Sequence, residues 1–208
     1  RDPEMSRGLG DVYKRQARNS HKSAYHAVLL RGLHVHYIYP QSAGKMGING
    51  PVTAENVDRL LEEHPETKMV YITSPTYDGV VSDVERIAEV VHRRKLPLIV
   101  DEAHGAHFPF SEQFPKDSVS CGADVVIHSV HKTLPSLTQT ALIHLNGDLI
   151  NRERIRYFLG VYQSSSPSYV MMAGIDQCME WVSSHRKEFD SFAPVSYTHL
   201  RAHETSQD

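Results

Sequence analysis

The chain has 208 residues, which is enough for one domain of ordinary size with a hydrophobic core. A formal net charge of −3 shows no basic excess that would attract nucleic acid or an anionic membrane, and a hydrophobic content of 40% argues against disorder. No apolar run approaches the ~18–20 residues that span a bilayer. We therefore expect a globular protein with a small-molecule partner.

The two ends of the chain lack the patterns of the middle. Residues 1–16 show no amphipathic period, and residues 195–208 are polar without a core-facing pattern. Both stretches resemble translated adapter or vector sequence, which is set aside before a fold is predicted. We predict that residues 1–16 and 195–208 are non-native tails and that residues 17–194 are part of a natural domain.

Helix and strand patterns alternate in the first half of this region. Gly32 is expected to end the first helix. The expected segments are a helix over residues 20–32, a strand over 33–39, a loop over 40–51, a helix over 53–64, a strand over 68–73 and a turn over 74–79.

Ser82 and Glu85 have the spacing of a capping box, so a helix is expected to begin there and to run to about Lys95. Its apolar residues recur at i, i+3, i+4 and i+7, as in a helix with one face on a sheet. Further strands are expected over residues 97–101, 123–127 and 140–145, and helices over 151–159 and 168–184. The alternation predicts an α/β fold with a mostly parallel sheet and helices on both faces.

Residues that could do chemistry gather at the ends of two predicted strands. The first strand end carries Asp101, Glu102, His104 and His107, and the second carries His128, Ser129, His131 and Lys132. In an open parallel sheet the strand ends face one crevice, where ligands bind. We expect an acid and a lysine to meet in that crevice.

The fourteen histidines raise the question of a metal site. A zinc site needs three or four converging ligands, with local pairs in a recognised spacing. The two candidate pairs lie in no such signature, and no metal is predicted; they are His104 with His107 and His128 with His131. The only two cysteines, Cys121 and Cys178, are read as buried thiols.

Residues 100–104, Val-Asp-Glu-Ala-His, also match the magnesium-binding box of DEAH-type nucleic-acid helicases. That function needs a phosphate-binding loop upstream. The pair Gly44-Lys45 has Tyr39 in place of the first glycine and Met46 in place of the hydroxyl residue, and the acidic net charge speaks against a nucleic-acid track. A second alternative is a non-enzymatic α/β fragment whose polar residues only cap strands.

Asp101 and Lys132 supply the two groups that pyridoxal phosphate (PLP) chemistry requires. This cofactor needs a lysine amine for a Schiff base and a carboxylate on its pyridine nitrogen. A strand-end Asp followed at this distance by Ser129-Val130-His131-Lys132 has the spacing found in fold-type I PLP enzymes.

Five segments then make a family resemblance specific. They are RNSHKS (18–23), TSPTYDG (73–79), VDEAHGAH (100–107), SVHKT (129–133) and SSSPSY (164–169). They span nearly all of residues 17–194 in the right order, and the region resembles the major domain of the Orn/Lys/Arg decarboxylase family. The resemblance implies the PLP-dependent transferase-like large domain of fold type I, here truncated.

The resemblance also implies roles for the matching residues. Lys132 would form the Schiff base, and Asp101 would hold the pyridine nitrogen. His21 would stack on one face of the ring, with Ala103 on the other. His104 would lie near the phenolic oxygen of the cofactor or the substrate carboxylate.

Other implied roles concern the phosphate and a second subunit. Ser129 and His131 would donate to the cofactor phosphate. Thr76 and Asp78 either line the pocket or only form a turn. The loop of Ser164, Ser165 and Ser166 would reach into a neighbouring active site, so a homodimer is expected.

The implied function is PLP-dependent decarboxylation of lysine, ornithine or arginine to the amine and CO₂, in the cytoplasm. Family members also carry a phosphate-binding loop upstream of the RNSHKS segment and a C-terminal domain, so we expect this fragment to be inactive alone. An aminotransferase or another fold-type I lyase stays open, because these enzymes share the Asp and the Lys.

Overall fold

The computed structural model describes residues 13–17, 19–40 and 48–192. The expected tail over 195–208, most of the tail over 1–16 and the centre of the loop over 40–51 lie outside the described residues.

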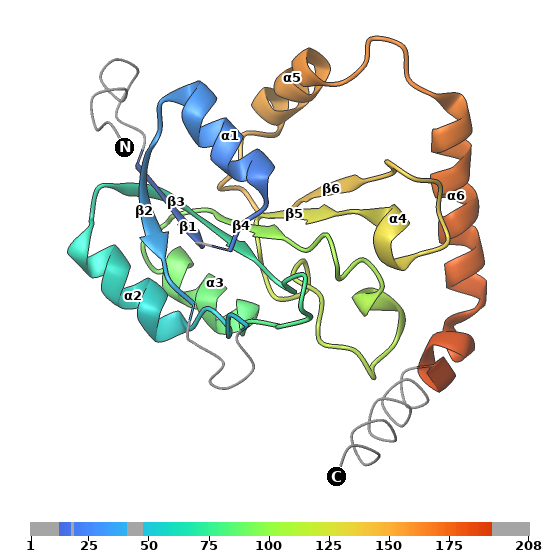
Figure 1. Cartoon of the computed structure of the whole chain (residues 1–208), viewed down its shortest axis with the longest axis horizontal. Helices are drawn as coiled ribbons and strands as arrows, with labels where there is room; N and C mark the ends of the chain where they lie inside the picture. The colour runs from blue at the N-terminus through green and yellow to red at the C-terminus, as the bar shows by residue number, and fades with distance from the viewer. Residues whose placement is uncertain (1–12, 18, 41–47, 193–208) are drawn as a thin grey trace.

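The described strands form one six-stranded sheet in the order β2-β1-β3-β4-β5-β6 (Figure 1). The pairs are parallel except β5 with β6, which is antiparallel. The strands are β1 (Tyr13–Ala17), β2 (His34–Ile38), β3 (Thr67–Thr73), β4 (Leu98–Asp101), β5 (Val125–His128) and β6 (Leu142–Leu145). The prediction of a mostly parallel sheet is confirmed.

Helices lie on both faces of this sheet, as predicted. They are α1 (Lys22–Arg31), α2 (Ala54–Glu63), α3 (Val84–His92), the 3₁₀ helix η3 (Phe108–Phe110), α4 (Val130–Thr133), α5 (Arg152–Tyr162) and α6 (Tyr169–Ser184). Ile38 of β2 packs in the core with α2, whereas its neighbour Tyr37 lies 6.2 Å from the ring of Tyr25 on α1. Because successive strand residues point to opposite faces, α1 and α2 lie on opposite sides of the sheet.

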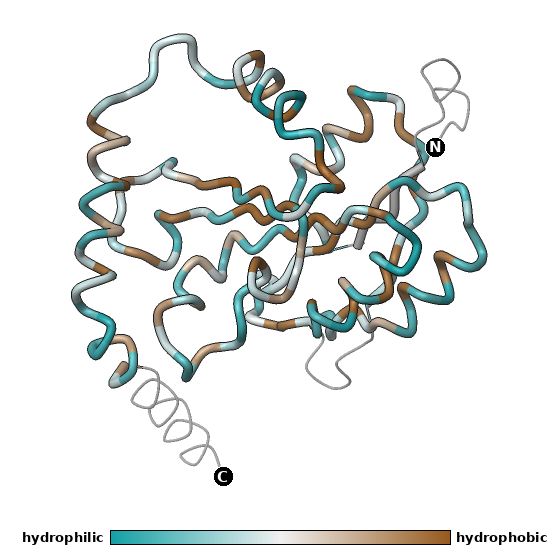
Figure 2. The backbone as a smooth tube through the Cα atoms, turned by 180° about the vertical axis from the view of Figure 1, so that it is seen from behind, coloured by the Kyte–Doolittle hydropathy of each residue, from teal (hydrophilic) through white to brown (hydrophobic). Residues whose placement is uncertain are grey.

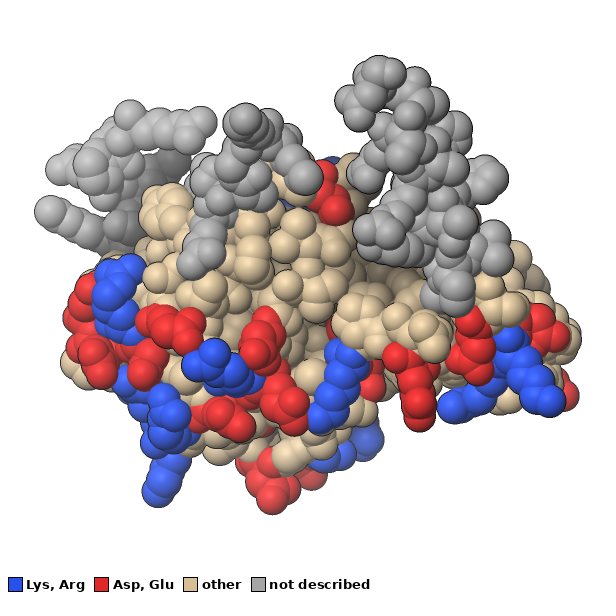
Figure 3. Space-filling model, turned by 90° about the horizontal axis from the view of Figure 1, so that it is seen from below, with Lys and Arg blue, Asp and Glu red and all other residues tan. Residues whose placement is uncertain are grey.

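The main core lies between the sheet and helices α2 and α3. Val70 and Ile72 of β3 are fully buried, as is Val100 of β4. They pack against the apolar faces of the two helices, which include Val57 and Ile87. Hydrophobic and hydrophilic residues alternate along these helices, and charges of both signs are interspersed on this side of the molecule (Figures 2 and 3).

A smaller core lies beyond the sheet edge, where α6 packs beside α4 (Figure 1). It joins Val130 and Leu134 to Cys178 and Val182 of α6. This packing supports the segment that carries Lys132. Among the described residues, no helix is both long and apolar enough to cross a membrane.

Gly32 ends α1 as predicted. It adopts a left-handed conformation with φ of 58°, which is strained for residues with a Cβ atom. The following amide, of Leu33, donates to the carbonyl of Val28 at 3.0 Å. These features form the common glycine-based helix end.

The predicted capping box at Ser82 is wrong. Asp83 caps α3 instead, because its carboxylate accepts a hydrogen bond from the Arg86 amide at 3.1 Å. The buried Ser82 hydroxyl accepts from the amide of Val52, at 3.0 Å, just before α2. The Ser82 hydroxyl, which the local pattern assigned to the helix cap, therefore forms a tertiary hydrogen bond instead.

Strand β1 crosses the boundary that the sequence suggested at residue 16. It lies between β2 and β3 and pairs with both. Strand hydrogen bonds join backbone groups, so a central strand can form without an apolar alternation in its sequence. The non-native origin of residues 1–16 and 195–208, and the domain over 17–194, stay predictions.

Candidate active site

A cavity of about 630 Å³ lies at the carboxyl ends of β3, β4 and β5, beside the start of α1. Parallel strands that end at one edge bring their following residues together. All the predicted cofactor and catalytic residues except His131 line this cavity: His21, Asp101, Ala103, His104, Ser129 and Lys132.

Asp101 is the last residue of β4 and is buried. Its Oδ2 accepts a hydrogen bond from the Tyr71 hydroxyl at 3.0 Å, and its Oδ1 accepts from the Ala103 amide at 3.2 Å. Burial, and then the negative charge of Asp101, raise the pKa of Tyr71 far above its ordinary value. Tyr71 therefore stays a donor and holds the carboxylate in one orientation.

Lys132 and His104 lie next to each other in the lining of the cavity. Lys132 is exposed on the one-turn helix α4, and its Nζ lies 3.1 Å from Nε2 of His104. Burial, and then the Lys132 charge, lower the pKa of His104, while Asp101 acts weakly in the opposite direction. A neutral His104 can accept a hydrogen bond from the ammonium group, which directs the amine.

His21 is the N-cap of α1, and its position follows from that role. Its Nδ1 accepts from the Ser23 amide at 3.3 Å and contacts the Ser23 hydroxyl at 2.9 Å. Because Nδ1 acts as an acceptor, the ring proton lies on Nε2. The capping interaction therefore sets both the ring orientation and its tautomer.

Three groups of residues that the sequence assigned to the site do not line the cavity. His131 does not line the cavity, and its Nδ1 donates to the Thr140 carbonyl at 2.8 Å. Thr76 accepts from the Val80 amide at 3.1 Å within the turn, and Tyr77 lines the cavity instead of Thr76 or Asp78. The exposed loop of Ser164, Ser165 and Ser166 connects α5 to α6, away from β4 and β5 (Figure 1).

Sequence reasoning missed Asn19, Tyr71 and Thr73, which also line the cavity. Thr73 is the register partner of Asp101, and Tyr71 precedes it by two residues on the same face. The alternation of side chains between the two faces of β3 could have indicated that Tyr71 and Thr73 share a face with each other. Asn19 Oδ1 and Thr73 Oγ1 are buried without a hydrogen-bond partner, as expected where a polar ligand completes a site.

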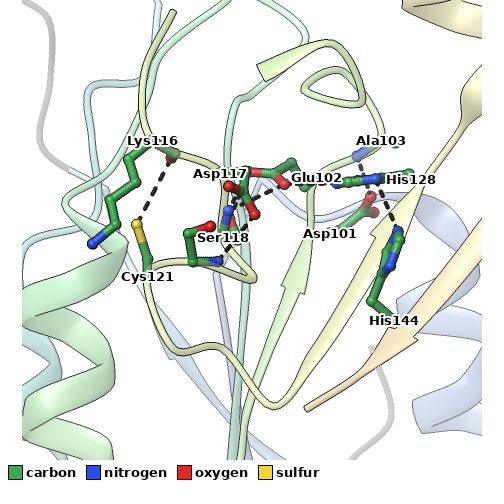
Figure 4. Close-up of polar contacts among 10 residues, drawn as sticks. Asp101, Glu102, Ala103, Lys116, Asp117, Ser118, Cys121, His128 and His144 are labelled. Atoms are coloured by element: carbon green, nitrogen blue, oxygen red, sulfur yellow. Dashed lines mark hydrogen bonds and ion pairs between the residues drawn. The ribbon is translucent and has the colours of Figure 1, made fainter. Parts of the chain in front are cut away.

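Glu102 does not line the cavity and lies in a buried polar network (Figure 4). It is 1% exposed, accepts from the Ser118 hydroxyl at 2.6 Å and contacts Nε2 of His128 at 2.7 Å. Nδ1 of His128 lies 3.1 Å from Nε2 of His144. This network ties the end of β4 to β5 and β6, and so supports the strand ends that carry Asp101 and Ser129.

Burial lowers the pKa of two further histidines near this network. His107 and His144 both lose proton affinity through desolvation first and through His128 second. Their folded-state pKa values lie below the unfolded value, so the unfolded chain binds more protons as the pH falls. Stability is therefore lost as the pH falls below about 6.5.

We predict that the free energy of unfolding in urea is lower at about pH 5.5 than at about pH 7.5. Each shifted histidine adds at most about 1.4 kcal/mol per pH unit to this slope. His107→Phe should flatten the slope, because it removes a group whose pKa is lowered in the folded state. A phenylalanine should fit there, since His107 packs on Phe108 and Phe114 and its Nδ1 is buried without a partner. The exposed His26 provides a control, His26→Phe; equal slopes in the two variants would contradict the prediction.

The comparisons with known proteins agree in one family. A model described as "Orn/Lys/Arg decarboxylase, major domain" matches residues 15–192. The uncharacterized protein YaaO of Bacillus subtilis is 42% identical over 166 residues, which cover 79% of this chain and 35% of that relative. An arginine decarboxylase of the same organism is 36% identical over 159 residues, or 76% of this chain and 32% of the relative.

A solved structure gives the same fold. The Francisella novicida lysine decarboxylase LdcF superimposes with a TM-score of 0.68 at 23% identity, over 84% of this chain and 26% of that one. The predicted fold class, the α/β large domain of fold-type I PLP-dependent enzymes, is confirmed. The chain spans about a third of the length of the curated relatives named above.

Proposed function

Because the chain belongs to the Orn/Lys/Arg decarboxylase family, we propose that the full-length protein catalyses the PLP-dependent decarboxylation of lysine, ornithine or arginine. The observation that supports this proposal most directly is that Lys132, Asp101, His21 and Ala103 line one cavity. An amine, a carboxylate, an aromatic ring and a small residue are the groups that hold a pyridine ring for such chemistry.

The residues present fit PLP. Lys132 would hold it covalently, Asp101 would bind the pyridine nitrogen, and Ser129 would donate to the phosphate. The unpartnered oxygens of Asn19 and Thr73 leave polar capacity in the cavity for further contacts. When bound, PLP withdraws electrons from the α carbon of an amino acid, which lets the carboxylate leave as CO₂.

Protein groups control the protons at this site. Nε2 of His104, whose pKa is lowered by burial and then by the charge of Lys132, can accept a hydrogen bond from Nζ of Lys132, 3.1 Å away, which positions the amine. The Asp101 carboxylate would hold a proton on the pyridine nitrogen of PLP, and the hydrogen bond from Tyr71 keeps that carboxylate in place. His21, which lines the cavity, would cover one face of the ring and leave the opposite face to the substrate.

Asp101→Asn should lower kcat/KM for CO₂ release by about 10²–10³-fold, because the amide keeps the shape but loses the charge. Tyr71→Phe should lower it by about 10-fold, since the carboxylate loses one hydrogen bond. Both are measured on the full-length protein loaded with PLP. Tyr157→Phe, at an exposed position on α5, is the control, and full activity of the Asn variant would contradict the role of Asp101.

Borohydride reduction of the PLP-loaded protein, followed by peptide mapping, tests the covalent site. A label on Lys132 is the expected result, and a label on another lysine would exclude the proposed site. CO₂ release from lysine, ornithine and arginine then identifies the substrate. Labelled Lys132 without CO₂ from any of the three would favour the aminotransferase alternative, while absence of PLP binding would favour a non-enzymatic role.

We further propose a homodimer with shared active sites, contacted by the loop of Ser164, Ser165 and Ser166. Support comes from the large apolar side chains beside this loop, since Tyr162 and Tyr169 are 72% and 79% exposed. In the full-length protein, a Lys132→Ala chain mixed with a loop-substituted chain should regain part of the activity. No recovery in dimers proven to be mixed would contradict site sharing.

A cytoplasmic location is the last part of the proposal, supported by two free cysteines. Cys178 is buried, as the sequence predicted, while Cys121 is only half-buried. Burial raises the pKa of the Cys121 thiol to about 11, which makes it unreactive at neutral pH. Cell fractionation tests the location, and recovery outside the cytoplasm would contradict it.

A further inference from the structure

Three metal-ligating side chains converge outside the cavity, where sequence spacing suggested no site. His36 lies in the middle of the edge strand β2, His64 is the C-cap of α2, and Glu66 immediately precedes β3. One nitrogen from each histidine and one carboxylate oxygen of Glu66 all lie within 4.8 Å of one another. His36 is far in sequence from His64 and Glu66, which are two residues apart, and the packing of α2 on β2 brings His36 to the other two.

The separations between these atoms approach those of a metal site. Oε1 of Glu66 lies 3.2 Å from Nδ1 of His64 and 3.6 Å from Nε2 of His36. Around a tetrahedral Zn²⁺ with bonds of about 2.0–2.1 Å, ligand atoms are about 3.3 Å apart. The two imidazole rings are already adjacent, with centroids 3.8 Å apart.

The surroundings hold the cluster in shape and leave it open to solvent. The Thr67 hydroxyl and amide both donate to the His64 carbonyl, at 2.7 Å and 3.2 Å, which fixes the turn between His64 and Glu66. The side chains of His36, His64 and Glu66 are 33%, 31% and 36% exposed, so an ion can enter. In the part of the chain that the structure describes, the ion pairs of Glu66 are with these two histidines.

We propose that His36, His64 and Glu66 bind a divalent transition metal ion through Nε2, Nδ1 and Oε1. Two imidazoles and a carboxylate suit Zn²⁺, and three protein ligands leave a fourth position for water. His36 points to the same sheet face as Ile38, toward α2, whereas the Asp101 cavity lies on the opposite face. The ion would link β2, α2 and β3 and is independent of the proposed decarboxylation.

The test is a Zn²⁺ titration of the untagged, chelator-treated chain against a chromophoric competitor. We expect one bound equivalent in the unsubstituted chain and its loss in His64→Ala and Glu66→Gln. The chain contains fourteen histidines, so His26→Ala, at an exposed position on α1, controls for unspecific binding and should retain the equivalent. Equal Zn²⁺ binding in all four proteins, or none in the unsubstituted chain, would overturn the proposal.

A second measurement needs no substitution and guards against loss of fold in the variants. Nitrogen-15 NMR of the imidazoles should show Zn²⁺ on Nε2 of one histidine and on Nδ1 of another, at one equivalent. Co²⁺ in place of Zn²⁺ should give the absorption of a four-coordinate site. Metal bound only through other nitrogens, or a Co²⁺ spectrum of the hydrated ion, would exclude this cluster.

Discussion

Lys132→Ala is expected to lower decarboxylation by the full-length protein by about 10³-fold or more, because no neighbouring side chain replaces the amine. Within the described residues, Lys132 is the lysine that lines the cavity, and its Nζ is directed by His104. CO₂ release and the absorbance of protein-bound PLP are the two measurements. The variant should fold normally, since the Lys132 side chain is exposed and lies outside the core.

Lys116→Ala is the matched control for this variant. Lys116 is exposed and forms an ion pair with Glu85 at 2.7 Å on the outer surface. Such exposed pairs contribute little to stability, so activity should be unchanged. If the Lys132→Ala protein retains activity near that of the Lys116→Ala protein, Lys132 is not the catalytic lysine.

Glu102→Ala is expected to lower the free energy of unfolding by about 3–5 kcal/mol, because it removes one partner of a buried pair. The substitution leaves Ser118 and His128 without their acceptor, at sites that are 0% and 5% exposed. Urea unfolding at about pH 7.5 measures the effect. A loss of this size would consume much of the stability of an ordinary domain.

Two further proteins separate the network from a general sensitivity to substitution. Glu112→Ala, at an exposed glutamate, should change the unfolding free energy by less than about 0.5 kcal/mol. The double variant Glu102→Leu with His128→Leu removes both partners and should be destabilised less than Glu102→Ala. A Glu102→Ala loss no greater than that of Glu112→Ala would show that the network is dispensable.

The centre of the site was predictable because adjacent parallel strands end at one edge. Asp101 ends an apolar strand and Lys132 lies shortly after the next one, so the α/β pattern places both at the same edge of the sheet. Tyr71 was missed although its register partner, Ile99, lies two residues before Asp101. The pairing of β3 with β4 brings the Tyr71 hydroxyl to the Asp101 carboxylate, and local sequence patterns do not predict which strands pair.

Local patterns failed where a distant group competed for the same atom. Ser82 has the spacing of a helix cap, but its hydroxyl accepts a hydrogen bond from the Val52 amide instead. His131 was expected to bind the cofactor phosphate, but its Nδ1 donates to the carbonyl of Thr140, just before β6. The metal-ligand cluster shows the opposite case. His36 and His64 have no recognisable spacing in the sequence, yet the packing of α2 on β2 brings them to adjacent positions.

The sequence by itself indicated the α/β class, the family resemblance, the helices and strands from α1 onward except η3 and α4, and the placement of Asp101 and Lys132 at neighbouring strand ends. These properties depend on apolar periodicity, turn residues and short motifs, which are local. Only the tertiary structure decided that Tyr71 holds Asp101, that Glu102 lies in a buried network and that β1 lies inside the sheet. Hydrogen bonds between distant segments form after packing has set their distances, so residue order alone does not specify them.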